Sequence, residues 1–189
     1  SVTIGGTVSP AGGNFEEPVT QATLKVVGAF HGLSRERSDA RKYPAIHPID
    51  SWSKYRGVVD MERVEQARSI LKRSNEINQM MKVIGEEGTS AEDYIVYQKG
   101  ELLDAVYLQQ NSFDPIDAAC DPDRQIHEFN VLYDVLTRDF ALSDKKEIRA
   151  FFNQVRQEFL DWHNTVFRTP EFEAQEKRLK DFYLSKAAG

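Results

Sequence analysis

Two short stretches of this sequence carry the residue types that bind flat heterocycles. Residues 43–51 read Tyr-Pro-Ala-Ile-His-Pro-Ile-Asp-Ser, and residues 107–114 read Tyr-Leu-Gln-Gln-Asn-Ser-Phe-Asp. Each stretch places an aromatic ring beside turn-forming or amide side chains. Because stacking on an aromatic ring contributes roughly 1–3 kcal/mol per base, a pair of rings near the end of a strand predicts a pocket for a base such as adenine.

The candidate pocket residues are two rings, one amide and one small side chain. Tyr43 precedes Pro44, which biases the tyrosine backbone toward an extended form, and Phe113 follows an amide-rich run. Gln109 offers both donors and an acceptor to the edge of adenine, and Ser112 is small enough to let a ring approach. The alternative for each ring is a position in the core, with Tyr43 under a turn and Phe113 at a helix end.

The residues that handle phosphate in many nucleotide sites are missing from these 189 residues. No Gly-x-x-x-x-Gly-Lys-Ser/Thr phosphate loop occurs in the sequence. Positioning of the γ-phosphate and its magnesium ion makes up most of the catalysis at such sites. The sequence therefore predicts half of a nucleotide site, and no catalytic residue is singled out.

Histidine and cysteine give no sign of metal or nucleophilic chemistry. The four histidines, His31, His47, His127 and His163, lack the i, i+4 spacing and the neighbouring carboxylates of a metal site, so no metal site is expected. Cys120 has no convincing local base, and a catalytic thiol is not expected. As the single cysteine it excludes an internal disulfide and is consistent with a reducing compartment.

Four carboxylates lie between two predicted helices: Glu86, Glu87, Glu92 and Asp93. One interpretation is a solvated turn between helices. The other is an electrostatic contact with a basic partner.

Composition indicates a globular chain that does not have nucleic acid as its main partner. Hydrophobic residues make up 40% and charged residues 29% of the sequence, and the net charge is −6. Phosphate backbones require a basic face, and Lys and Arg do not cluster here. No apolar run approaches the ~20 residues that span a bilayer, and residues 1–4 lack the basic region of a signal peptide. Residues 1–4 instead suggest a strand entered in the middle of a fold.

The first 57 residues contain most of the glycines and prolines together with β-branched runs. They predict short strands at residues 2–4 and 7–8, and a strand at residues 23–30 that is buried on both faces. Residues 34–41 predict a short charged helix with Ser34 as its N-cap.

From residue 58 onward the apolar spacing becomes helical and predicts an antiparallel bundle. The first helix covers residues 60–84, with Asp60 as its cap and Met61 in its apolar stripe. The later helices open at Ser90, Asp121, Ser143 and Thr169. The residues expected to be buried in the last three helices are Ile126, Phe129, Leu132, Leu136, Ile148, Phe151, Phe152, Val155, Phe159, Trp162, Phe172, Leu179 and Phe182.

Taken together, these segments resemble the catalytic A subunit of V-type and A-type rotary ATPases. The resemblance covers residues 8–19, which read Val-Ser-Pro-x-Gly-Gly-x-Phe-x-Glu-Pro-Val, and residues 107–114, followed by Cys120 and Pro122. Residues 43–51 also resemble the F-type β subunit. The resemblance implies a mainly α fold: residues 1–57 form the β-containing tail of the α/β nucleotide-binding domain, and residues 58–189 form a C-terminal helical bundle.

The resemblance also implies roles for the candidate pocket residues. Tyr43 matches the aromatic residue that stacks on adenine, and Phe113 matches the second wall of that pocket. Ser112 stands in place of the usual alanine, with Gln109 beside it. The implied ligand is ATP or ADP with magnesium in the parent subunit, and tight binding by this chain alone is not expected.

Partners follow from the same resemblance. Residues 85–93 match the acidic lever that touches the central rotor stalk in the F-type β subunit. The acidic ends, Glu86, Glu87, Glu92 and Asp93, are kept and the middle charges are lost. Non-catalytic B subunits of an alternating hexamer are the other expected partners. The parent would work in the cytoplasm, peripheral to the membrane, and would couple ATP chemistry to transport of protons or sodium ions. The alternatives are a non-catalytic helical scaffold or a regulatory subunit of the same complex.

Overall fold

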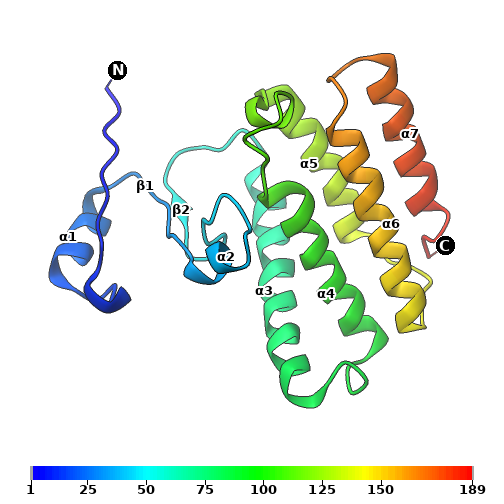
Figure 1. Ribbon diagram of the computed structural model, residues 1–189, viewed down its shortest axis with the longest axis horizontal. Helices are drawn as coiled ribbons and strands as arrows, with labels where there is room; N and C mark the ends of the chain where they lie inside the picture. The colour runs from blue at the N-terminus through cyan, green and yellow to red at the C-terminus, as the bar shows by residue number, and fades with distance from the viewer. Residues whose placement is uncertain (1, 189) are drawn as a thin grey trace.

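A bundle of long helices forms the C-terminal part of the molecule in the computed structural model, which describes residues 2–188 (Figure 1). Helix α3 packs against α4 and α5, α4 packs against α6, and α6 packs against α7. The predicted mainly α fold with an antiparallel bundle is confirmed. The bundle helices are α3 (Met61–Ile84), α4 (Ala91–Leu103), α5 (Pro122–Thr137), α6 (Lys145–His163) and α7 (Pro170–Leu184).

Each bundle helix begins at a side chain that accepts a hydrogen bond from a backbone N–H in its first turn. Such a cap satisfies a donor that the helix itself leaves unpaired. The predicted opening of the fourth helix at Ser143 is wrong by one residue, because Asp144 accepts the hydrogen bond from the Glu147 N–H at 3.0 Å. A carboxylate also complements the positive end of the helix dipole, which a hydroxyl does not. The five caps are Asp60, Ser90, Asp121, Asp144 and Thr169.

The core of the bundle lies where the apolar stripes of the helices meet. Two residues expected there are exposed instead. Ile126 is 37% exposed because it lines a groove between α5 and the start of α7. Met61 is exposed at the first position of α3. The most deeply buried side chains are Val135, Ile148, Val155, Phe159, Trp162 and Leu179.

Helices α3 and α4 approach closely at Gly100. A Cβ atom at this position would lie 2.2 Å from the Cβ and Oγ atoms of Ser74. Ser74 is buried, and its hydroxyl donates a hydrogen bond to the Tyr97 carbonyl at 3.1 Å. The absence of a side chain at Gly100 therefore sets the spacing of these two helices.

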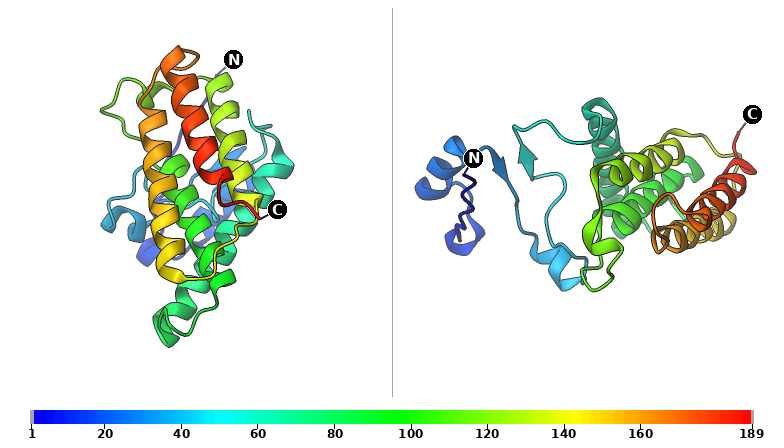
Figure 2. Two further views of the ribbon diagram at one scale, coloured as in Figure 1. Left: turned by 90° about the vertical axis from the view of Figure 1, so that its right-hand side faces the viewer. Right: turned by 90° about the horizontal axis from the view of Figure 1, so that it is seen from above.

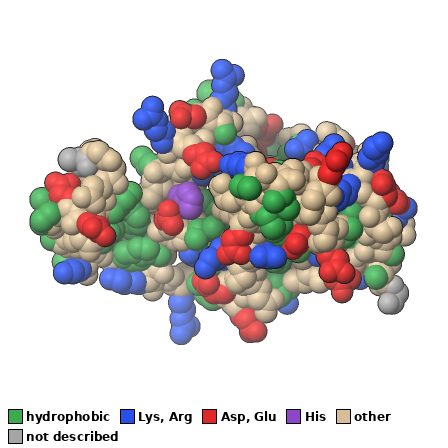
Figure 3. All heavy atoms as spheres, turned by 90° about the horizontal axis from the view of Figure 1, so that it is seen from below, with side chains coloured by type: hydrophobic (Ala, Val, Ile, Leu, Met, Phe, Trp, Pro, Cys, Tyr) green, Lys and Arg blue, Asp and Glu red, His purple; other side chains and the backbone are tan. Residues whose placement is uncertain are grey.

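The N-terminal part extends away from the bundle (Figures 1 and 2). Strands β1 and β2 pair in antiparallel register, with Ala29 opposite Ser53 and Phe30 opposite Trp52. Hydrophobic side chains gather over this part at the left of Figure 3, whereas acidic and basic side chains alternate over the bundle. Its elements are a 3-10 turn (Ala11–Gly13), α1 (Pro18–Val26), β1 (Ala29–Phe30), α2 (Arg35–Asp39) and β2 (Trp52–Ser53).

The predicted strands of the N-terminal part are largely wrong. Residues 2–4 and 7–8 have no regular secondary structure, and Ser1 of the predicted strand lies outside the described residues. Residues 18–26 form α1, since Pro18 favours a first helical turn and the Thr23 hydroxyl donates to the carbonyl of Val19. Val26, expected inside a doubly buried strand, is 82% exposed.

The predicted short helix is confirmed as α2. Ser34 caps it by accepting a hydrogen bond from the Arg37 N–H at 3.2 Å. Arg37 is the buried residue of this helix, so α2 meets the bundle through a charged side chain rather than an apolar face.

Candidate functional site

The two aromatic stretches lie side by side. The backbone N–H of Gln110 donates a hydrogen bond to the carbonyl of Tyr43 at 2.9 Å. This bond joins the beginning of residues 43–51 to the middle of residues 107–114. The predicted approach of these two stretches is present in the backbone, which brings them into direct contact.

Both candidate rings point into solvent. Tyr43 is 53% exposed and Phe113 is 96% exposed. The alternative reading, in which each ring is a core residue, is therefore wrong for both. An exposed ring of this size is available for stacking on a planar ligand.

Phe113 stands at the tip of a loop that is held by short-range hydrogen bonds. The Phe113 N–H donates to the Asn111 side-chain oxygen at 3.1 Å, and the Asn111 N–H donates to Asp117 at 2.5 Å. The Gln110 amide donates to the Asp117 carbonyl at 2.8 Å. Ser112 lies in the same exposed loop. These bonds present the ring outward without burying it.

Gln109 is fixed by the end of α4. This helix continues into a π-helical turn, Asp104–Leu108. The Gln109 amide donates to the carbonyl of Asp104 at 3.3 Å, which leaves its side-chain oxygen as an acceptor for a ligand.

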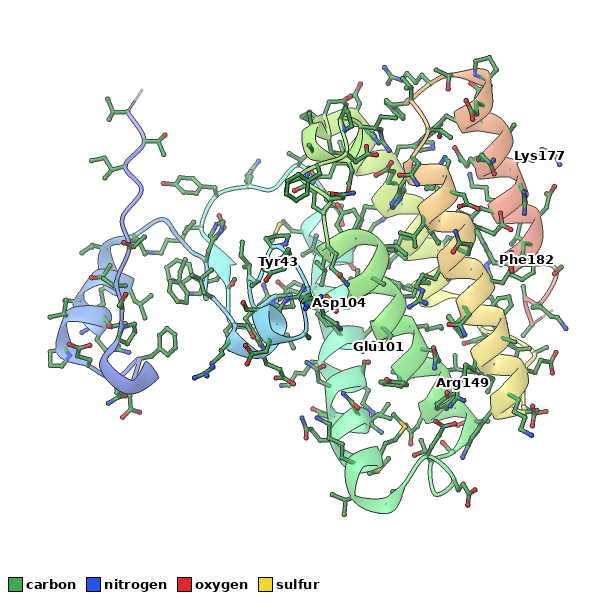
Figure 4. The ribbon with its side chains drawn as sticks, in the orientation of Figure 1. Tyr43, Glu101, Asp104, Arg149, Lys177 and Phe182 are labelled. Carbon is green, nitrogen blue, oxygen red and sulfur yellow. The ribbon has the colours of Figure 1, made fainter. Side chains whose placement is uncertain are left out.

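The side chain of Asp104 connects this turn to the N-terminal part. One carboxylate oxygen lies 2.5 Å from Arg37 Nη1 of α2, and the other lies 2.5 Å from Lys42 Nζ. Figure 4 shows Asp104 next to Tyr43 at the junction between the N-terminal part and the bundle. No motif in the sequence predicted this cluster.

A cavity of about 390 Å³ opens between the two stretches. Gln109 is the predicted pocket residue that lines it, whereas Tyr43, Ser112 and Phe113 lie outside its lining. One wall is formed by Pro44, Ile46 and Pro48, and the other by Tyr107, Leu108, Gln109 and Gln110.

Two titratable groups, Glu128 and His163, also line this cavity. Burial, together with the charge of Arg124, lowers the pKa of His163 to about 4. Burial raises the pKa of Glu128, although the Arg124 guanidinium at 2.6 Å opposes the shift. Because His163 is neutral, its 3.8 Å approach to Glu128 is not an ion pair at neutral pH. The i, i+4 spacing of Arg124 and Glu128 was the signal in the sequence for this pair.

Cys120 and the metal-ligating residue types are the remaining candidates for chemistry in the part of the chain that the structure describes, residues 2–188. Burial raises the pKa of Cys120, so its thiol is not primed as a nucleophile. Within residues 2–188, no three His, Cys, Asp or Glu side chains gather into a group that could hold a metal ion.

The acidic loop between α3 and α4 is tied to the rest of the bundle. The Arg149 side chain on α6 reaches the Glu86 carboxylate at 2.6 Å. Lys145 Nζ donates to the backbone carbonyls of Glu86 at 2.6 Å and Glu87 at 3.0 Å. The loop is therefore more than a solvated turn.

The remaining carboxylates of this loop divide into paired and exposed groups. Asp93 pairs with Arg73 of α3 at 3.0 Å. Glu87 and Glu92 have exposed side chains. A basic partner at this end of the bundle would meet Glu87 and Glu92 first.

Two family models match this chain. Residues 1–53 match the nucleotide-binding domain of the ATP synthase alpha/beta family, and residues 61–151 match the C-terminal domain of V and A type ATP synthase. The fold and the matches together define the class as an ATP synthase subunit. The chain belongs to the V-type ATP synthase alpha chain family, which confirms the resemblance described above.

Individual relatives agree with this assignment. The V-type ATP synthase alpha chain of Borrelia turicatae is 63% identical over 186 residues, which are 98% of this chain and 32% of the relative. That of Treponema denticola is 60% identical over 187 residues, which are 99% of this chain and 32% of the relative. The chain thus spans about a third of the length of the curated relatives it matches.

A solved structure supports the fold. The unique ATP synthase subunit NeqB from Nanoarcheaum equitans superposes with a TM-score of 0.56 at 16% sequence identity, and the match covers 67% of this chain and 33% of that one. Among the helices of residues 2–188, none has the length and apolar character needed to cross a membrane.

Proposed function

We propose that this chain supplies the adenine side of the nucleotide site, together with a lever, in the catalytic subunit of a rotary V-type ATP synthase. Residues 1–57 would complete the nucleotide-binding domain, and residues 58–189 would form the moving bundle. The observation that carries this proposal is the bond between Gln110 and Tyr43, because it joins two stretches that resemble the two walls of an adenine pocket.

Recognition of the base would rest on stacking and on one amide. Tyr43 and Phe113 are exposed rings on adjoining segments, and a base between them would replace water on both faces. Gln109 would meet the edge of adenine, and the small side chain of Ser112 would leave room for the base. This part of the chain offers no phosphate loop, so the phosphates and magnesium of ATP would be held by other residues of the parent subunit, and this chain alone would not hydrolyse ATP.

Coupling would pass along α4. This helix begins at the acidic loop and ends at Asp104, beside the proposed adenine pocket. Its 13 residues span about 20 Å at 1.5 Å per residue. If open and closed states bind the nucleotide with different affinity, binding shifts the position of the bundle. The loop would then push on a rotor stalk through Glu87 and Glu92.

The surroundings of the parent subunit belong to the same proposal. Non-catalytic B subunits would alternate with it in a hexamer, and the assembly would sit in the cytoplasm against the membrane through its ion-translocating sector. The competing role, a helical scaffold or regulatory subunit, predicts that the exposed rings have no ligand.

The test is substitution of Tyr43 by Ala in the full-length subunit. ATP affinity should fall several-fold because stacking is lost, while the affinity for tripolyphosphate, which has no base, should stay constant. Tyr55→Ala is the matched control, since Tyr55 is also an exposed tyrosine of the N-terminal part. Isothermal titration of each variant with both ligands gives the comparison, and unchanged ATP affinity in Tyr43→Ala would reject the adenine assignment.

A further inference from the structure

Asp104 is a buried carboxylate at a junction between segments far apart in the sequence. It is 4% exposed and lies where α4 gives way to the π-helical turn. Each of its oxygens bonds to a different cation, Arg37 or Lys42, at 2.5 Å. Both cations come from the segment that leads into Tyr43.

The attachment of α2 to the bundle depends on this carboxylate. The helix reads Arg-Glu-Arg-Ser-Asp, and Arg37 is its buried residue. Five polar residues offer no apolar face for docking, so α2 is held by charge. Removing one member of a buried ion pair leaves an uncompensated charge, which is strongly destabilising. The position of α2 against the bundle therefore depends on the negative charge of Asp104.

Asp104 is connected to the candidate pocket residues by two sets of contacts. Lys42 directly precedes Tyr43, and its own N–H donates to the Arg37 carbonyl at 2.8 Å, which closes the turn between the two cations. In the other set, the Asp104 carbonyl accepts the Gln109 amide at 3.3 Å. One residue thus fixes the segment that carries the ring and the side chain that would meet the base edge.

We propose that Asp104 is a positioning residue for base recognition. Its carboxylate sets the place of Tyr43 through Arg37 and Lys42, and its backbone carbonyl sets the place of Gln109. The inference rests on the adenine pocket proposed above. It adds that the ring moves with the bundle, because Asp104, which anchors the ring, directly follows α4.

The test is Asp104→Asn in the full-length subunit, a change that keeps the shape of the side chain and removes its charge. ATP affinity should fall about tenfold, which is 1.4 kcal/mol, while tripolyphosphate affinity should stay constant. Lys42→Gln, at a partly exposed position, should give a smaller loss with the same base dependence and serves if Asp104→Asn does not fold. Asp134→Asn is the matched control, because Asp134 also binds an arginine within the bundle.

A double variant separates positioning from a general structural role. Because the Asp104 carboxylate acts through Tyr43, and the backbone carbonyl that holds Gln109 is kept in Asp104→Asn, this substitution should cost little additional ATP affinity in a Tyr43→Ala background. Full additivity would overturn the proposal, as would a parallel loss of affinity for ATP and tripolyphosphate. If Tyr43→Ala lowers ATP affinity and Asp104→Asn does not, the positioning role fails and the pocket stands. If Tyr43→Ala has no effect, the pocket and the positioning role both fail.

Discussion

Arg149 on α6 binds the Glu86 carboxylate of the acidic loop and also donates a hydrogen bond to the Tyr94 hydroxyl of α4 at 3.0 Å. One side chain thereby connects the loop, α4 and α6. A single guanidinium nitrogen, Nη2, contacts both oxygens of Glu86, while Nε donates to Tyr94. Helix α6 therefore braces the end of the bundle where a rotor contact is proposed.

Arg149→Gln should loosen this loop. The backbone amides of residues 86–89 should exchange with solvent several-fold faster, because the loop loses its side-chain link to α6 and keeps only the bonds from Lys145 to its backbone carbonyls, while the helices keep their core. Hydrogen exchange read by mass spectrometry measures this directly.

Lys177→Gln provides the control for the loop. Lys177 pairs with Asp181 on the exposed face of α7 (Figure 4), and exposed pairs of this kind contribute little. Exchange in the loop should stay at the level of the unsubstituted chain. Equal exchange in both variants would mean that Arg149 does not brace the loop.

Gly100→Ala should destabilise the bundle even though alanine is the better helix former. The helix propensity gain is about 1 kcal/mol, but the new methyl group would lie 2.2 Å from the Cβ and Oγ atoms of Ser74. Overpacking of a core costs typically about 1–3 kcal/mol, so the net free energy of unfolding should fall. Urea denaturation measures the change.

A second substitution tests whether the loss comes from this contact. Ser74→Gly removes the atoms that collide, so the Gly100→Ala change should cost less in that background than in the original chain. Gly57→Ala is the control, since its nearest neighbour, the sulfur of Met61, would lie at an ordinary 3.5 Å. Equal costs in both backgrounds would point away from a steric cause.

His163, whose side chain is 14% exposed, should make the bundle sensitive to acid. Its pKa falls from 6.5 to about 4 on folding because burial disfavours the charged ring, so between these values the unfolded chain binds a proton that the folded chain does not. The free energy of unfolding therefore keeps its full value above pH 6.5. Protonation of His163 in the unfolded chain lowers it as the pH falls toward 4, by about 3 kcal/mol in all. Glu128, whose pKa burial raises, acts in the opposite direction.

His163→Gln isolates the histidine from the other titrating groups. The decrease in unfolding free energy between neutral pH and about pH 4 should be smaller in this variant than in the original chain. Urea unfolding at the two pH values gives the difference. The same decrease in both proteins would show that His163 does not carry the effect.

Phe113→Ala should leave folding unchanged. The ring is 96% exposed, and surface substitutions usually change stability by less than about 0.5 kcal/mol. Phe129→Ala is the contrast, because Phe129 is a buried core residue and truncating a buried phenylalanine costs about 3–5 kcal/mol. Chemical denaturation compares them; a large loss in Phe113→Ala would place this ring in the folding core.

The sequence predicts the bundle well because its signals are local. Caps such as Asp60 and Ser90 act within one turn, and apolar spacing along α6 marks the buried face over its whole length. The N-terminal part is predicted poorly for the complementary reason. The β-branched residues of 19–27 favour a strand, yet the helix start at Pro18 decides the local structure.

Only part of the candidate site can be predicted from the sequence. The rings of Tyr43 and Phe113 can be found from their neighbours, and the juxtaposition of their segments follows from the family resemblance. The anchors cannot be found that way, because Arg37 and Asp104 are separated by 67 positions and Arg149 and Glu86 by 63. No spacing rule relates residues this far apart, and the fold alone brings them together.

Helix α4 connects the acidic loop to Asp104, so its length sets the rotational orientation of one end relative to the other. An α-helix turns by about 100° per residue, so one residue inserted or deleted within Ala91–Leu103 would rotate one end relative to the other by that angle. Asp104 would then face away from Arg37, even if the inserted or deleted residue left the hydrophobic residues of the helix unchanged. The contact between Asp104 and Arg37 therefore depends on the length of this helix as much as on the two side chains.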